Sequence, residues 1–161
     1  MEQGFKNADA ALSENPEIAV LTSGISMRPM LRQHRDIVII ERVNRRLKVG
    51  DVPLYRREGC ERFVLHRIVK LTDNGYVIRG DNLYQNEYTV TDDDIIGVLK
   101  AFYRDGKYYD CAKSRAYKAY SVYIRLNYPI RWLWRVKTKP FLARITPRPI
   151  KKLIKRILKK Q

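Results

Sequence analysis

The sequence predicts a mainly β protein, with an antiparallel β domain followed by a basic, helical C-terminal extension. Short runs rich in β-branched and aromatic residues recur over residues 17–110, and clusters of Gly, Asn and Asp separate them. After residue 110 the residues become helix-compatible, and the charge changes as well. Residues 111–161 carry 16 Lys and Arg and no Asp or Glu, whereas residues 1–110 balance 17 basic against 17 acidic residues. We therefore place a domain boundary between residues 110 and 111.

An N-terminal segment, residues 1–16, precedes the β domain. Its pattern predicts a short helix over residues 5–14. The helix should end before Asn15-Pro16, because the residue ahead of a proline avoids the helical region.

The β domain, residues 17–110, is expected to consist of short antiparallel strands. Asn74-Gly75 and Asp105-Gly106 each stand between two β-rich runs, which predicts two tight hairpins. No long helical pattern interrupts the runs, as is typical of an all-β domain. The expected strands lie in "EIAVLTS", "DIVIIERV", "DVPLYRR", "RFVLHRIVKLT", "GYVIRG", "YTVT" and "IIGVLKAFYRDGKYY".

The extension, residues 111–161, is expected to be helical in pieces. "KSRAYKAYSVYIRLNY" is helix-compatible, and prolines at 129, 140, 147 and 149 divide the rest of the chain. The clearest amphipathic helix is residues 149–160. Its apolar residues recur at i, i+3, i+4, i+7 and i+8, and six Lys or Arg occupy other positions. The apolar set is Ile150, Leu153, Ile154, Ile157 and Leu158.

Ser26, in "SGISMRPM", is either a turn residue or a nucleophile. A serine hydroxyl needs a neighbouring base to remove its proton, and the domain offers two histidines. His34 lies in a polar connection and is expected to be an exposed turn residue. His66 is embedded in "FVLHRIV", so it is either an interior structural histidine or a general base.

Several short motifs in one order favour the catalytic alternatives for Ser26 and His66. SG-x-SM-x-PML, "RDIVII", "VGDVPLYRR", "LHRIV", "GYVIRGDN" and "IIGVL" succeed one another over about half of the chain. This series resembles the superfamily of signal peptidases and LexA-like repressors, which are serine peptidases on a mostly β fold. In bacterial-type signal peptidases and LexA-like repressors the base at this motif is a lysine. With a histidine in "LHRIV", this chain resembles the endoplasmic-reticulum and sporulation-type branch, in which the base is a histidine.

The resemblance implies a function and three catalytic residues. It implies a serine endopeptidase that cleaves a leader, a signal or a specific protein substrate, with Ser26 as nucleophile and His66 as base. Asp81, in the Gly-Asp-Asn motif, would orient His66. Asp92, Asp93 and Asp94 are the alternatives for that third role. Relatives that add an oxyanion-binding serine two positions before the nucleophile are not matched, because that position is Gly24. The backbone N–H of Ser26 is then the expected oxyanion donor.

Two departures bear on the substrate. "HRD" stands where relatives usually have Gly-Asp, and neither the N-terminal transmembrane helix of signal peptidases nor the DNA-binding domain of LexA-like repressors is recognisable. A second hypothesis is a non-catalytic binding module that keeps the peptidase fold and whose basic tail binds anionic membrane or nucleic acid. No cofactor is expected. Cys60 and Cys111 predict no disulfide framework, and with only two histidines in the chain they predict no zinc site.

The basic extension is expected to contact an anionic membrane surface. An apolar stripe, two tryptophans and many tyrosines accompany the cations, and these residue types favour the bilayer interface. Nucleic acid, a protein partner and packing on the β domain are the alternatives. No secretory signal and no run of ~20 apolar residues is recognisable. We therefore expect a cytoplasmic protein attached peripherally to the inner face of the membrane.

Overall fold

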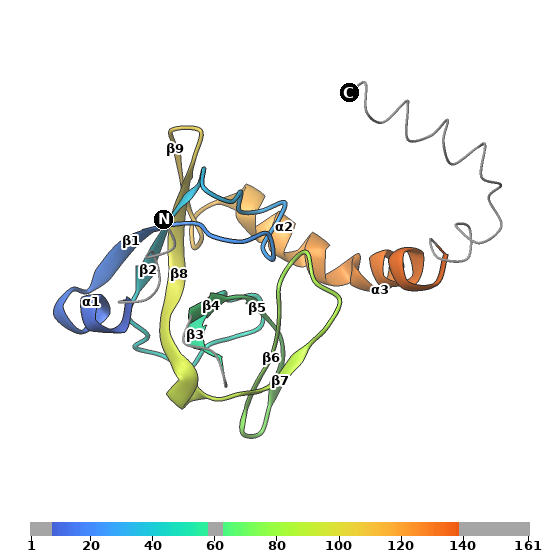
Figure 1. Ribbon diagram of the computed structural model, residues 1–161, viewed down its shortest axis with the longest axis horizontal. Helices are drawn as coiled ribbons and strands as arrows, with labels where there is room; N and C mark the ends of the chain where they lie inside the picture. The colour runs from blue at the N-terminus through green and yellow to red at the C-terminus, as the bar shows by residue number, and fades with distance from the viewer. Residues whose placement is uncertain (1–7, 58–62, 139–161) are drawn as a thin grey trace. The chain divides into compact units, whose positions relative to one another are not determined.

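The computed structural model describes residues 8–57 and 63–138 (Figure 1). The chain divides into two compact units, with the boundary between Arg125 and Leu126. The first unit is mainly β and antiparallel, which confirms the predicted fold class at this level. It begins with α1 (Ala8–Glu14), the described part of the expected N-terminal helix. Leu12 of α1 is buried, and its Cδ1 lies 3.0 Å from where a Cβ on Gly97 would stand. A glycine at position 97 thus lets α1 pack closely against the sheet.

Two antiparallel sheets form the first unit, and every strand that the structure describes lies within residues 17–110, as predicted. The larger sheet has the order β1-β2-β8-β3-β4, and β9 pairs with β8 in a hairpin. Figure 1 shows β8 as the long strand beside which the others are arranged. The smaller sheet has the order β5-β6-β7. The strands are β1 (Glu17–Leu21), β2 (Ile37–Glu41), β3 (Pro53–Arg56), β4 (Phe63–Leu65), β5 (Arg67–Thr72), β6 (Gly75–Arg79), β7 (Glu87–Val90), β8 (Ile95–Arg104) and β9 (Lys107–Asp110).

Both predicted hairpins are present. Thr72 pairs with Gly75 across the Asp73-Asn74 turn. Arg104 pairs with Lys107 across Asp105-Gly106, where both turn residues have positive φ, 50° and 75°. That is the left-handed conformation that Asp-Gly tolerates in a two-residue hairpin.

One expected strand is in fact two. "RFVLHRIVKLT" breaks at His66, where β4 ends in the larger sheet and β5 begins in the smaller one. A continuous run of alternating residues cannot reveal such a corner, because both halves have β character. The corner places His66 where the two sheets join.

Two apolar clusters hold the first unit together. One includes Leu12 of α1, Val38 and Ile40 of β2, and Leu54 of β3. The other includes Tyr55 of β3 with residues of the smaller sheet, among them Ile68, Tyr76 and Ile78. Adjacent residues of β3, Leu54 and Tyr55, thus point into different clusters, as the two-residue period of a strand requires.

The predicted boundary after residue 110 is corrected by the structure. α2 (Arg115–Leu126) is the expected helix, but nearly all of it belongs to the first unit. Ile124 and Ser121 are buried, and Tyr117 and Tyr120 pack against the first apolar cluster. The charge therefore changes earlier in the chain than the compact unit does, because α2 belongs to the basic region yet buries one face on the β domain.

The second unit contains α3 (Tyr128–Trp132) and a π-helical segment, η2 (Leu133–Thr138). Pro129 stands in the first turn of α3, where proline is well tolerated. The amphipathic helix predicted over residues 149–160 lies outside the described residues. None of the helices in the described part of the chain is long and apolar enough to cross a bilayer.

Candidate active site

Ser26 lies in the loop between β1 and β2 and is half-buried. The loop is fixed by its apolar residues, since Met27, Met30 and Leu31 are 3–5% exposed and belong to the first apolar cluster. Gly24 has a φ of 81°, a conformation that side chains rarely adopt. In "SGISMRPML", Gly24 thus allows the chain to turn, and the buried Met27, Met30 and Leu31 anchor the loop. Ser26 lies between Gly24 and Met27.

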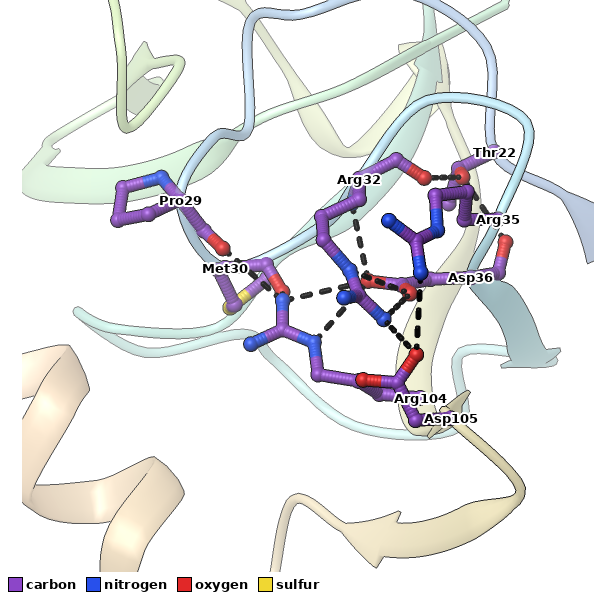
Figure 2. Close-up of polar contacts among 8 residues, drawn as sticks. All are labelled: Thr22, Pro29, Met30, Arg32, Arg35, Asp36, Arg104 and Asp105. Carbon is purple, nitrogen blue, oxygen red and sulfur yellow. Dashed lines mark hydrogen bonds and ion pairs between the residues drawn. The ribbon is translucent and has the colours of Figure 1, made fainter. Parts of the chain in front are cut away.

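A cluster of charges around the buried Asp36 anchors the other end of this loop. Figure 2 shows the guanidinium groups of Arg32, Arg35 and Arg104 around the carboxylates of Asp36 and Asp105. Arg32 donates to Asp36 Oδ1 through Nε at 3.1 Å and Nη2 at 2.9 Å, and Arg104 Nε donates to Oδ2 at 3.2 Å. Burial acts to raise the pKa of Asp36, but the arginine hydrogen bonds outweigh it and lower that pKa. Asp36 therefore remains a buried anion that holds the loop on β8.

Arg104 also contacts the loop backbone three and four residues after Ser26. Its Nη2 donates to the carbonyl oxygen of Pro29 at 2.9 Å and to that of Met30. Thr22 closes the loop, because its hydroxyl oxygen lies 2.7 and 2.8 Å from the carbonyl oxygens of Arg32 and Asp36, which share its single hydrogen. These bonds fix the loop backbone from Thr22 to Asp36 (Figure 2).

His66 is buried at the corner between β4 and β5, with 3% of its surface exposed. Its Nδ1 lies 3.0 Å from Oε1 of Glu87, at the start of β7, and 3.2 Å from the hydroxyl of Tyr55 on β3. The Tyr55 hydroxyl in turn lies 2.8 Å from Glu87 Oε2. His66, Tyr55 and Glu87 thus form a closed triangle of polar contacts.

Glu87 determines which ring nitrogen of His66 carries hydrogen. Burial acts to raise the pKa of Glu87, but hydrogen bonds from His66 and Tyr55 and the charge of Arg57 outweigh it, so the pKa is lowered. Arg57 Nε lies 3.1 Å from Oε2. The ionised carboxylate can only accept hydrogen bonds, so Nδ1 of His66 donates to it. In the neutral ring Nε2 is then the unprotonated, basic nitrogen.

Gly80 brings the Ser26 loop and His66 together. A Cβ at position 80 would lie 2.8 Å from the carbonyl oxygen of Ser26 and 3.0 Å from Nε2 of His66. The neighbouring Asn82 N–H donates to that same Ser26 carbonyl at 2.7 Å, and its side chain donates to Ile25 O at 3.2 Å. Only glycine fits between the two segments, so the Gly-Asp-Asn motif acts as the spacer that joins them.

Nε2 of His66 has no hydrogen-bond partner in the described part of the chain. Ser26 Oγ and His66 are not hydrogen-bonded to each other in the described part of the chain. The imidazole is thus held through Nδ1, and the Ser26 backbone passes near its Nε2 edge at Gly80.

Asp81 does not have the predicted role of orienting His66. Its carboxylate pairs with Arg67, whose Nε and Nη2 lie 2.8 and 2.9 Å from Oδ1 and Oδ2, and the Tyr120 hydroxyl donates to Oδ2 at 3.1 Å. Arg67 is 1% exposed, so its charge needs this carboxylate. The prediction for Asp81 is therefore corrected, and Glu87 occupies the position beside Nδ1.

The three alternative aspartates have other contacts or positions. Asp92, Asp93 and Asp94 form the short 3-10 helix η1 before β8. Asp92 accepts from the Tyr76 hydroxyl, and Asp94 Oδ2 accepts from the backbone N–H and hydroxyl of Thr91 at 2.8 and 2.9 Å. His34 is exposed in a turn with a φ of 57°, as expected.

Glu87 could not be predicted as the partner of His66, because the sequence of a single strand does not determine its register against the neighbouring strand. In the structure Glu87 pairs with Ile78, and Arg67 pairs with Arg79, so the hairpins of the smaller sheet bring Glu87 to His66. The connection over residues 80–86 is too long to fix that register by turn type. The only sequence feature that marks Glu87 is its place as an acidic residue at the start of a β-rich run.

In the described part of the chain, no group of three or more His, Cys, Asp or Glu side chains is arranged to hold a metal ion. No protein-family model matches this chain, and no solved structure matches it.

Proposed function

We propose that this chain is a serine endopeptidase of the signal-peptidase and LexA-like type, in which Ser26 is the nucleophile, His66 the general base and Glu87 the residue that orients the base. One observation carries the proposal. The Ser26 loop and Nε2 of His66 meet at Gly80, and Nδ1 of His66 lies 3.0 Å from the partly buried, ionised carboxylate of Glu87.

The chemistry depends on the protonation state of His66. Nε2 removes the proton from Ser26 Oγ as the oxygen attacks a peptide carbonyl, and the imidazolium then gives that proton to the leaving amine. Water repeats the sequence to release the acyl group from Ser26. Glu87 stabilises the imidazolium while it exists, since the negative charge lies 3.0 Å from Nδ1. The Ser26 backbone N–H is the proposed oxyanion donor.

Tyr55 keeps Glu87 in place and ionised. Its hydroxyl donates to Oε2, so Oε1 remains directed at His66. Burial and the negative charge of Glu87 raise the pKa of Tyr55, which therefore stays protonated and remains a donor. The absence of a direct Ser26–His66 hydrogen bond in the described residues is compatible with catalysis, because such bonds are often long before substrate binds.

The test uses a fluorophosphonate probe, which forms a covalent bond with activated serines. We expect labelling of the full chain at Ser26, identified by mass spectrometry of peptides, and none in Ser26→Ala. Ser23→Ala is the matched control, since Ser23 is an exposed serine of the same loop and should leave labelling unchanged. A folded wild-type chain that stays unlabelled would instead support a non-catalytic binding module.

A further inference from the structure

The second unit presents apolar side chains to solvent beside arginines. Leu126, Ile130, Leu133 and Trp134 are 72, 68, 51 and 58% exposed, and Val136 is 46% exposed. Monomeric soluble proteins rarely expose so many large apolar side chains in one short segment. The segment over residues 126–138 therefore has an exposed apolar surface of the kind that binds a partner or a membrane.

These side chains recur with a helical period. Leu126, Ile130, Leu133 and Trp134 stand at i, i+4, i+7 and i+8, and Asn127 between α2 and α3 has helical angles of −79° and −4°. Leu126 ends α2, Ile130 lies in α3, and Leu133 and Trp134 begin the π-helical η2 that follows α3 directly, so the four residues lie near one side of this helical segment. The segment's arginines, Arg131 and Arg135, are themselves four residues apart and fall between the apolar positions. The segment is thus amphipathic, with an apolar stripe flanked by cations.

Charge indicates which partner fits. No Asp or Glu occurs in residues 111–161, whereas 16 Lys and Arg do. The phosphates of a nucleic acid would pair with the cations, but they offer no apolar surface for an exposed stripe of Leu, Ile and Trp. An anionic bilayer satisfies both, since its headgroups attract the cations and its acyl boundary accepts the apolar side chains.

We infer that residues 126–138 form an interfacial membrane-binding surface, in which Leu126, Ile130, Leu133 and Trp134 enter the headgroup–acyl boundary of an anionic leaflet. The sequence pattern places membrane contact on the whole extension, residues 111–161, and the exposed side chains assign a part of it to residues 126–138. This surface is independent of the proposed peptidase chemistry, because none of its residues contributes to the site around Ser26 and His66.

The chain's two tryptophans make a direct test, because Trp132 and Trp134 both lie in this segment. Intrinsic fluorescence of the full chain would be recorded with vesicles of phosphatidylglycerol and phosphatidylcholine, with phosphatidylcholine alone, and with duplex DNA. We expect a blue shift and protection from acrylamide quenching with the anionic vesicles, and neither effect with DNA.

Substitutions locate the surface. Ile130→Ser combined with Leu133→Ser should weaken vesicle binding at least about tenfold, because each change removes a buried apolar side chain from the interface. Leu71→Ser, at a partly exposed apolar residue of β5, is the matched control and should bind as the wild type does. Absence of a blue shift with anionic vesicles, equal protection by DNA, or unchanged binding of the double variant would each overturn the inference. Labelling of Ser26 in solution reports on the peptidase proposal separately.

Discussion

At the scale of the residue, the environment of His66 depends on Glu87. The carboxylate is ionised because His66, Tyr55 and Arg57 together overcome the effect of burial on its pKa. Gly80 is equally specific, since any side chain there would collide with the Ser26 backbone or the His66 ring. Two residues outside the proposed nucleophile–base pair thus determine whether that pair can form.

Replacing Glu87 by Gln should affect both activity and stability. We expect fluorophosphonate labelling per folded molecule at pH 7 to slow about tenfold or more, because Nδ1 loses its carboxylate and the tautomer is no longer fixed. Glu41→Gln, a half-exposed glutamate on β2, is the control and should leave labelling unchanged.

The pH dependence of the same variant reflects the lowered pKa of Glu87. A carboxyl whose pKa falls on folding stabilises the native state above its ordinary value, here 4.5, and loses that contribution as pH falls through the lowered pKa. Urea unfolding at pH 7 should show Glu87→Gln to be less stable than wild type by about 1–3 kcal/mol. The difference should shrink in acid. A gap that grows as pH falls would contradict this assignment.

Two of the three residues in the proposed site, Ser26 and His66, are predicted from the sequence, and their roles stay a prediction. Ser26 and His66 can be found because short motifs surround them, whereas Asp81 is favoured only by its position in a glycine turn. The buried Arg67, which follows His66 in the chain, forms an ion pair with Asp81. The Asp81 carboxylate therefore does not serve as the partner of His66. Local motifs predict turns. Which carboxylate, that of Asp81 or that of Glu87, lies beside His66 depends instead on long-range ion pairing and strand register.

At the scale of the element, α2 completes the β domain. Arg67 Nη1 lies 3.1 Å from Ser121 Oγ and 3.3 Å from the Tyr117 hydroxyl, and its guanidinium group lies over both Tyr117 and Tyr120. These contacts keep the Arg67–Asp81 pair away from water. Burial also raises the pKa of Cys111 to about 12, although a hydrogen bond with Tyr117 opposes it.

Two truncations test the corrected boundary. A chain ending at Arg125 should unfold cooperatively in urea, because it keeps α2. A chain ending at Asp110 should be less stable by at least about 2 kcal/mol, since it loses the hydrogen bonds from α2 to a buried charged pair. Equal stability of the two chains would restore the boundary that charge alone suggests.

At the scale of the whole molecule, the sequence predicts the extent of the β domain better than its internal division. Turn residues punctuate the strands, so β1 begins at Glu17 and β9 ends at Asp110 as expected. The strand that breaks at His66 and the helix that joins the domain could not be predicted, because both depend on which apolar faces meet in three dimensions. The signal-peptidase and LexA-like architecture stays a prediction.

The molecule also separates its two proposed activities along the chain. The Ser26–His66 site lies in the first unit, and the apolar stripe of residues 126–138 lies in the second. A variant that abolishes one activity should therefore leave the other intact, which distinguishes a membrane-bound peptidase from a membrane-bound protein with no catalysis.

The chain's two histidines provide the most direct test of the central claim. The measurement is the second-order rate of fluorophosphonate labelling at Ser26 in wild type, His66→Ala and His34→Ala. The account predicts that His66→Ala slows labelling at least about 100-fold, as expected when a general base is lost, while His34→Ala, at an exposed turn, labels at the wild-type rate. Equal rates in the folded wild-type and His66→Ala proteins would contradict it.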